Sequence, residues 1–188
     1  IPGVIFQQGS EKEYLDLAGK LPPSPFFFHT GVDSNNVQIL SCIPEKLHNL
    51  LGKRFSELSF NHGSSSFLSY LFKERFNLIG QEIWINLFGE HAYIAAFTDQ
   101  ELSVFNRFEV ETKEDVLKYA LILMETLQHD RNHARVTLFG ASEKSGITEA
   151  WGKSYFSNFR ILRPHTNQNY GPGLSQEKAP TIFESFWN

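Results

Sequence analysis

Three consecutive runs of alternating hydrophobic and polar residues occupy positions 81–110 of the chain. Alternation with a period of two is typical of β-strands that bury one face. Only two residues separate successive runs, at 89–90 and at 99–100, and turns this short join antiparallel neighbours. The sequence therefore predicts an antiparallel meander of three strands. The alternating positions are Ile83, Ile85 and Leu87, then Tyr93, Ala95 and Phe97, then Leu102, Val104 and Phe108.

The pattern changes to helical spacing after residue 111. Thr112 and Asp115 have the spacing of a capping box, in which the two side chains satisfy backbone amides at a helix start. Apolar residues then recur every three or four positions, so we expect a helix from Thr112 to about His129. These apolar residues are Val116, Ala120, Leu123, Met124 and Leu127.

A strand, a helix and another strand complete this half of the chain. Residues 135–139 are a short apolar run of the kind found in buried strands, and Gly140 ends it. Residues 143–155 predict a helix, and residues 158–162 predict a last strand that is stopped by Pro164. The predicted fold class is α/β, with a mixed sheet built in the order βββαβαβ.

The first 80 residues have weaker patterns. Residues 1–36 read as irregular, with a short extended run at 26–29, because prolines at 22, 23 and 25 disfavour a helix there. Residues 37–43 predict a buried strand. Residues 44–54 predict a helix with Pro44 as its first residue, since proline is favoured at that position. Residues 57–61 then predict a strand, and residues 63–76 a second helix.

The change of pattern at residues 77–81 predicts a domain boundary. We expect an incomplete first subdomain at 1–80 and a second subdomain at 81–164. Residues 165–180 are polar and rich in turn-forming residues, so they read as a loop, and the apolar terminus 181–187 is expected to dock back on its own domain.

Composition narrows the classes of partner. The 188 residues carry a formal net charge of -4 with no long basic run, which gives no electrostatic reason to expect nucleic acid as a partner. No stretch reaches the roughly 18 apolar residues of a membrane helix. Cys42 is the only cysteine and lies in an apolar run, so we expect a buried, inert thiol and a cytoplasmic location. The chain starts with Ile1 rather than Met, as a fragment would.

The order of elements in the second half is similar to one subdomain of the actin-like ATPase fold, a relative of ribonuclease H. Several short segments also resemble an uncharacterised bacterial family, domain of unknown function 3822. These segments are Ile-Pro-Glu-Lys-Leu at 43–47, Phe-Asn-His-Gly-Ser-Ser-Ser-Phe-Leu at 60–68, Glu-Ile-Trp-Ile-Asn-Leu-Phe-Gly at 82–89, Phe-Asn-Arg-Phe at 105–108, Thr-Lys-Glu-Asp-Val-Leu-Lys-Tyr at 112–119, Val-Thr-Leu-Phe-Gly at 136–140 and Arg-Ile-Leu-Arg-Pro at 160–164. The resemblance covers about residues 4–164. It implies an actin-like fold of two subdomains, with the opening strands of the first one missing, and it implies no particular reaction.

The resemblance also indicates where a nucleotide would bind. An actin-like ATPase places an Asp and glycines in the first hairpin of a subdomain, where backbone amides hold phosphates and the carboxylate organises Mg²⁺. Here Asn86 stands near the expected Asp, and the bulky Leu87 and Phe88 follow it, which disfavours hydrolysis. Residues 136–142 resemble the strand and turn beside adenosine, with one glycine left. The candidate ATP-binding residues are therefore Asn86, Gly89, Gly140 and Ser142.

Other motifs of catalytic chemistry are missing from the sequence. There is no phosphate-binding loop of the Gly-x-x-x-x-Gly-Lys type, and Ser64 to Ser66 fit N-capping of a helix better than anion binding. His129 and His133 are four residues apart, but the intervening residues indicate a helix exit, so we predict no metal site. No Gly-x-Ser-x-Gly nucleophile elbow occurs, and we assign no catalytic residue.

Two classes of function follow. The first is a non-catalytic interaction or scaffold protein with a degenerate nucleotide site, whose partner is another protein. The alternative is a nucleotide-binding ATPase or small-molecule kinase, whose missing acidic residue would lie outside this chain. Oligomeric state is not predicted by the sequence.

Overall fold

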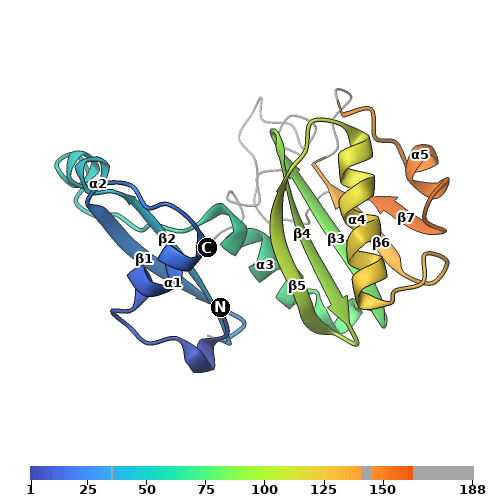
Figure 1. Ribbon diagram of the computed structural model, residues 1–188, viewed down its shortest axis with the longest axis horizontal. Helices are drawn as coiled ribbons and strands as arrows, with labels where there is room; N and C mark the ends of the chain where they lie inside the picture. The colour runs from blue at the N-terminus through green and yellow to red at the C-terminus, as the bar shows by residue number, and fades with distance from the viewer. Residues whose placement is uncertain (35, 141–144, 163–188) are drawn as a thin grey trace. The chain divides into compact units, whose positions relative to one another are not determined.

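The computed structural model describes residues 1–34, 36–140 and 145–162. Its contacts divide the chain into two compact units, the first spanning Ile1–Phe72 and the second beginning at Lys73 (Figure 1). The change of sequence pattern favoured a boundary slightly later, at residues 77–81. The expected loop and docking terminus, 165–188, lie outside the described residues.

The second unit is built on a five-stranded mixed sheet with the strand order β5-β4-β3-β6-β7. The predicted meander is confirmed, because β3 pairs antiparallel with β4 and β4 with β5. Strand β6 then adds parallel to β3, and β7 adds parallel to β6. The five strands are β3 Gln81–Phe88, β4 His91–Thr98, β5 Glu101–Glu109, β6 Arg135–Phe139 and β7 Asn158–Ile161.

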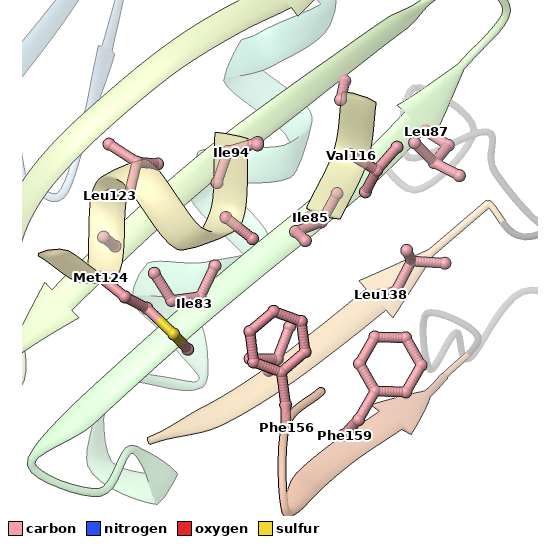
Figure 2. Close-up of a cluster of buried hydrophobic side chains, with 14 of the residues drawn as sticks. Ile83, Ile85, Leu87, Ile94, Val116, Leu123, Met124, Leu138, Phe156 and Phe159 are labelled. Atoms are coloured by element: carbon pink, nitrogen blue, oxygen red, sulfur yellow. The ribbon is translucent and has the colours of Figure 1, made fainter. Parts of the chain in front are cut away.

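The helix α4 Lys113–Leu127 packs on one face of this sheet and builds the main core (Figure 2). Ile83 and Ile85 lie on this face of β3, and the register pairs them with Ala96 and Ile94 of β4. Tyr93, Ala95 and Phe97, the alternating residues predicted for β4, lie on the opposite face of the sheet, as their register partners on β3 show. Further side chains of the core are Leu87, Ala92, Val116, Ala120, Leu123, Met124, Val136, Leu138, Phe156 and Phe159.

The capping box predicted for α4 is present. The Thr112 Oγ1 accepts a hydrogen bond from the Asp115 backbone N–H at 3.2 Å, and the Asp115 carboxylate accepts one from the Thr112 N–H at 3.0 Å. The Asp115 carboxylate also accepts a hydrogen bond from the Thr112 hydroxyl at 2.9 Å, and this bond, together with those from the Thr112 and Glu111 N–H groups, lowers the pKa of Asp115 because it stabilises the charged form. Gln128 adopts a left-handed conformation directly after the helix and ends it, as the sequence predicted to within two residues.

The second predicted helix is shorter than expected. Helix α5 covers Glu149–Lys153, and residues 145–148 before it are not α-helical, so the expectation of a helix from 143 onward is wrong for those residues. Gly146 has a φ of +63°, a conformation that interrupts a helix. The helix starts where Thr148 accepts a hydrogen bond from the Trp151 N–H at 3.1 Å. Gly152 lies so close to the ring of Phe159 that a side chain there would collide with it.

A buried ion pair ties the start of β3 to β6. The Glu82 side chain is fully buried, and its carboxylate contacts the guanidinium of Arg135, with an Nε–Oε2 hydrogen bond of 3.0 Å. It also accepts a hydrogen bond from the Ile79 N–H at 2.8 Å, while Arg135 donates to the Asn77 carbonyl at 2.8 Å. Burial raises the pKa of Glu82, which Arg135 partly offsets. The pair therefore fixes both β6 and the segment that leads into β3.

A polar chain joins the end of α4 to the second hairpin. The Ser103 hydroxyl donates to Thr98 Oγ1 at 3.0 Å, and Thr98 Oγ1 lies 3.0 Å from Nε2 of His129. His129 is buried, and no group in the described part of the chain hydrogen-bonds its Nδ1. A protonated ring would bury an N–H donor without an acceptor, and burial accordingly lowers the pKa of His129.

The first unit contains a two-stranded hairpin between helices. Strand β1, Pro25–Val32, pairs antiparallel with β2, Val37–Pro44, over their whole length. On one face Phe26 stacks on His48 of α2 with ring centroids 3.7 Å apart, and Phe60 contacts the same rings. On the other face His29 contacts Phe6 and Glu11. The flanking helices are α1 Glu11–Ala18, α2 Glu45–Gly52 and α3 Gly63–Lys73, with a short 3-10 turn at Gly3–Ile5. A second 3-10 turn, Arg75–Asn77, opens the second unit.

Several expectations for this unit were wrong. The extended run expected at 26–29 is confirmed as part of β1, but residues 1–36 are otherwise less irregular than expected, since α1 forms after Ser10 and β1 extends over Pro25–Val32. Residues 57–61 form no strand. Pro44 is the N-cap of α2 rather than its first helical residue. Cys42 is half-buried rather than buried, and burial raises the pKa of its thiol, so the reactive thiolate is disfavoured.

No helix among the described residues is both long enough and apolar enough to cross a membrane.

Replacing Arg135 alone should destabilise the protein more than replacing Arg135 and its ion-pair partner Glu82 together. Arg135→Met leaves Glu82 buried without a counter-charge, so we expect the free energy of unfolding to fall by about 3 kcal/mol in urea denaturation. Adding Glu82→Gln removes the uncompensated charge and should recover part of that loss. Lys153→Met is the matched control, because its pair with Glu149 is half-exposed and should contribute about 0.5 kcal/mol or less. A double variant as unstable as the sum of its two single variants would contradict this account.

His129 should make stability depend on pH. Its pKa is lower in the folded chain than in the unfolded one, where it is about 6.5. The unfolded chain therefore binds the proton more readily, and stability falls as pH drops below about 6.5. Urea denaturation between pH 5 and 8 should show a steeper loss for the wild-type chain than for His129→Gln, which keeps the other histidines. Equal slopes for the two chains would show that His129 makes no such contribution.

Candidate functional site

The candidate site is built on the hairpin between β3 and β4. Residues Phe88 and His91 form its last pair, so Gly89 and Glu90 make a two-residue turn. Gly89 has a φ of +59°, and a Cβ added to it would meet no atom within 4 Å. The turn therefore needs glycine for its backbone conformation rather than for space.

The parallel pairing of β3 with β6 brings the predicted site residues to one edge of the sheet. Asn86 is the register partner of Phe139, and Gly140 follows directly with a φ of +81°. Because parallel strands end at the same edge, Asn86, Gly89 and Gly140 all belong to the edge formed by the carboxyl ends of β3 and β6. Ser142, the fourth predicted residue, lies outside the described residues.

Asn86 is a buried amide with an unsatisfied acceptor. Its side chain is 3% exposed, and no donor among the described residues reaches its Oδ1. A buried acceptor without a partner costs on the order of 1–3 kcal/mol, so such an atom calls for an explanation. Asn86 can accept a hydrogen bond from a ligand donor, but it carries no charge with which to bind Mg²⁺ as a carboxylate does.

Leu87 and Phe88, the two bulky residues that follow Asn86, lie in different environments. Leu87 turns into the core under α4, where Figure 2 shows it beside Val116, so its side chain does not obstruct the site. Phe88 is 51% exposed at the end of the strand. The sequence argument that both side chains would hinder a phosphate therefore holds for the exposed Phe88 alone.

A group of aromatic and cationic side chains lies on the same sheet face as Asn86. Trp84 stacks on Phe139 with ring centroids 5.5 Å apart, and the Arg160 guanidinium lies 5.5 Å from the Trp84 ring centroid. The Nε of Arg160 also donates to Thr137 Oγ1 at 2.8 Å. Sequence reasoning missed this group, although strand alternation places Trp84 and Asn86 on one face and the parallel register adds the residues of β6 and β7.

The acidic residues of the hairpin are not arranged for metal binding. Glu82 is held by Arg135 and the Ile79 N–H at the opposite end of β3 from the turn, and Glu90 is exposed in the turn itself. Across residues 1–34, 36–140 and 145–162, no group of three or more His, Cys, Asp or Glu side chains could hold a metal ion.

The predicted helix-exit histidines do not converge. His129 is buried against Thr98, whereas the largely exposed His133 lies 2.7 Å from the Asp130 carboxylate. These two contacts turn the imidazoles to different partners, which gives no pair of ligands for one ion.

The start of α3 is satisfied by its own neighbours. The His62 Nδ1 lies 3.2 Å from the Ser64 backbone nitrogen and 2.7 Å from its Oγ, and the Ser65 hydroxyl donates to the His62 carbonyl at 2.6 Å. Ser64 and Ser65 are buried. The capping side chain is thus His62 rather than a serine, and these contacts favour a structural role over anion binding.

Comparison with a solved structure gives the fold. The chain is similar to a Bacteroides thetaiotaomicron protein with an actin-like ATPase fold and unknown function, with a TM-score of 0.76 and 17% sequence identity. The match covers 86% of this chain and 63% of that one. At this identity the likeness establishes an actin-like ATPase fold and no activity. Among curated proteins, no similar sequence was found.

Sequence comparison gives the family. The profile of the family described as "Protein of unknown function (DUF3822)" matches residues 1–159, which is most of the chain and includes the hairpin, α4 and β6. The chain therefore belongs to this family of unknown function, as the short matches in its sequence indicated.

Proposed function

We propose that this chain acts as a non-catalytic interaction protein, which keeps an actin-like fold while its nucleotide site has lost the charged group needed for hydrolysis. The observation that carries the proposal is Asn86, a neutral and buried amide at the position where the resemblance to actin-like ATPases expects an Asp. An amide oxygen can orient a donor, but it cannot replace a carboxylate in organising Mg²⁺ and water around a phosphate.

The surroundings of Asn86 support the same proposal. Glu82, four residues earlier on the same face, is already engaged by Arg135, and burial raises its pKa. Arg160 is a second positive group of this face, and its contacts with Thr137 and the Trp84 ring hold it against the sheet. These contacts serve packing of the face and require no phosphate.

Nucleotide binding without hydrolysis is the second candidate function. Gly140 favours it, because a left-handed glycine directly after β6 leaves the backbone beside Asn86 free of a side chain. The unsatisfied Oδ1 of Asn86 also favours it, since a bound ligand could supply the missing donor. An ATPase or small-molecule kinase would in addition need an acidic group that the described edge does not supply.

Calorimetry with ATP and Mg²⁺ tests the proposal. We expect no saturable heat when ATP is titrated up to millimolar concentration into the chain, and no release of inorganic phosphate. Micromolar binding with turnover would overturn the proposal. Binding without turnover would support the second candidate, and Asn86→Ala should then weaken it roughly tenfold, by about 1.4 kcal/mol. Asn106→Ala is the matched control, because Asn106 is exposed on β5 and outside the candidate site.

A further inference from the structure

Strand β5 is the outermost strand at one side of the five-stranded sheet (Figure 1). Directly after it, the Val110 N–H donates to the Glu90 carbonyl at 2.9 Å, so Val110 directs its backbone toward β4. The residues that bond to one neighbour alternate along an antiparallel strand. Phe108 therefore also bonds toward β4, whereas Arg107 and Glu109 direct their N–H and C=O groups away from the sheet.

These outward backbone groups have no partner strand. Within residues 1–34, 36–140 and 145–162, no group bonds the N–H or C=O of Glu109 or the C=O of Arg107. The Arg107 N–H is held by the side chain of the preceding residue, since Asn106 Oδ1 accepts from it at 2.8 Å. Asn106 is exposed, so its side chain can rotate away when another acceptor arrives. This stretch of β5 is thus a short backbone edge that a further strand can join.

The two outward residues carry opposite charges on one face of the sheet. The register sets Arg107 opposite Tyr93 and Glu109 opposite His91, two residues that share a face of β4. Both charged side chains are exposed. Neither forms an ion pair or a hydrogen bond with a group that the structure describes. Both charges therefore remain available to a group on another molecule.

A second copy of the same strand supplies these partners in one register. When two copies of β5 pair antiparallel about Phe108, Arg107 of one copy lies opposite Glu109 of the other, and the twofold symmetry repeats the contact. Directly opposed unlike charges stabilise a pair of strands, and like charges destabilise it. A register centred on Arg107 would instead oppose two guanidinium groups. The charge pattern therefore selects the register centred on Phe108.

The same register places an aromatic pair at the centre of the contact. Phe108 lies on the α4 face, where its ring stacks on that of Tyr119 with centroids 4.3 Å apart, and it is half-buried. The two Phe108 residues would form a non-hydrogen-bonded pair, the kind whose side chains lie closer together. Aromatic pairs across strands are favourable, and this one would remove part of each exposed ring from water.

We propose that two copies of this chain associate through their β5 strands, which pair antiparallel about Phe108 and set Arg107 of each copy against Glu109 of the other. The pairing stops near residue 110, because the Asp115 carboxylate already holds the Glu111 N–H at 3.2 Å. So short an interface should give a weak dimer. The inference goes beyond the proposed function, because it concerns association of the chain with itself and involves no nucleotide.

Sedimentation equilibrium of the intact chain at low ionic strength tests the proposal, and we expect a monomer–dimer equilibrium. Glu109→Arg should weaken the dimer roughly tenfold, because both symmetry-related contacts then oppose two positive charges. Arg107→Glu should weaken it similarly by opposing two negative charges. The double variant restores unlike charges across the pair and should recover the dimer. Glu101→Arg is the matched control, because it makes the same change of charge on β5 outside the paired stretch.

NMR on the unaltered chain gives a measurement that needs no variant. A mixture of isotope-labelled and unlabelled chain should show contacts between the Hα protons of Phe108 in the two copies. The Glu109 amide should exchange more slowly as the concentration rises, because it becomes hydrogen-bonded, whereas the Phe108 amide already faces β4 and should change little.

Three results would each overturn the proposal. The first is a chain that stays monomeric up to millimolar concentration. The second is a dimer that neither single charge reversal weakens, and the third is a folded double variant that does not recover the dimer, with the thermal midpoint as the measure of folding. None of these results bears on the titration with ATP, so this proposal and the proposed function can fail separately.

Discussion

The parallel pairing of β3 with β6 is the contact on which the second unit and its candidate site depend. The partners are distant in sequence, Glu82 facing Arg135 at one end of the ladder and Asn86 facing Phe139 at the other. The first pair is an ion pair that anchors the beginning of both strands, and the second brings the hairpin next to Gly140. Without this register the edge that carries Asn86 would have no second strand, and Arg160 of β7 could not reach the Trp84 face.

The two faces of β3 are both buried but differ in chemistry. The face under α4 is aliphatic and includes Ile83 and Ile85, whereas the opposite face carries Glu82, Trp84 and Asn86. A central strand with elements packed on both faces of its sheet is expected to be buried on both sides, but polar groups there must be paired. Glu82 meets this requirement through Arg135, whereas the Oδ1 of Asn86 finds no donor within residues 1–34, 36–140 and 145–162.

Local patterns in the sequence were sufficient for much of this fold. Period-two alternation, two-residue turns and the Thr112 capping box depend on neighbours in the chain, and the meander and α4 were predicted correctly from them. Helix α1 was missed because it is short, buries no residue fully and lies between proline- and glycine-rich segments. The strand expected at 57–61 did not form, since a short alternating segment without a partner strand has no ladder to join. The edge residues Asn86, Gly89 and Gly140 came from resemblance, whereas the Glu82–Arg135 pair and the Trp84 group depend on a register that no local pattern encodes.

The central claim of this account is that β3 and β6 run side by side, in parallel, with Asn86 opposite Phe139. Nuclear Overhauser contacts between backbone protons of the two strands test it most directly, because they require protons within about 5 Å and neighbouring strands lie about 4.8 Å apart. The account predicts cross-strand contacts that link Ile85 with Leu138 and Asn86 with Phe139. Contacts in an antiparallel pattern, or in a register shifted by one or more residues, would contradict it.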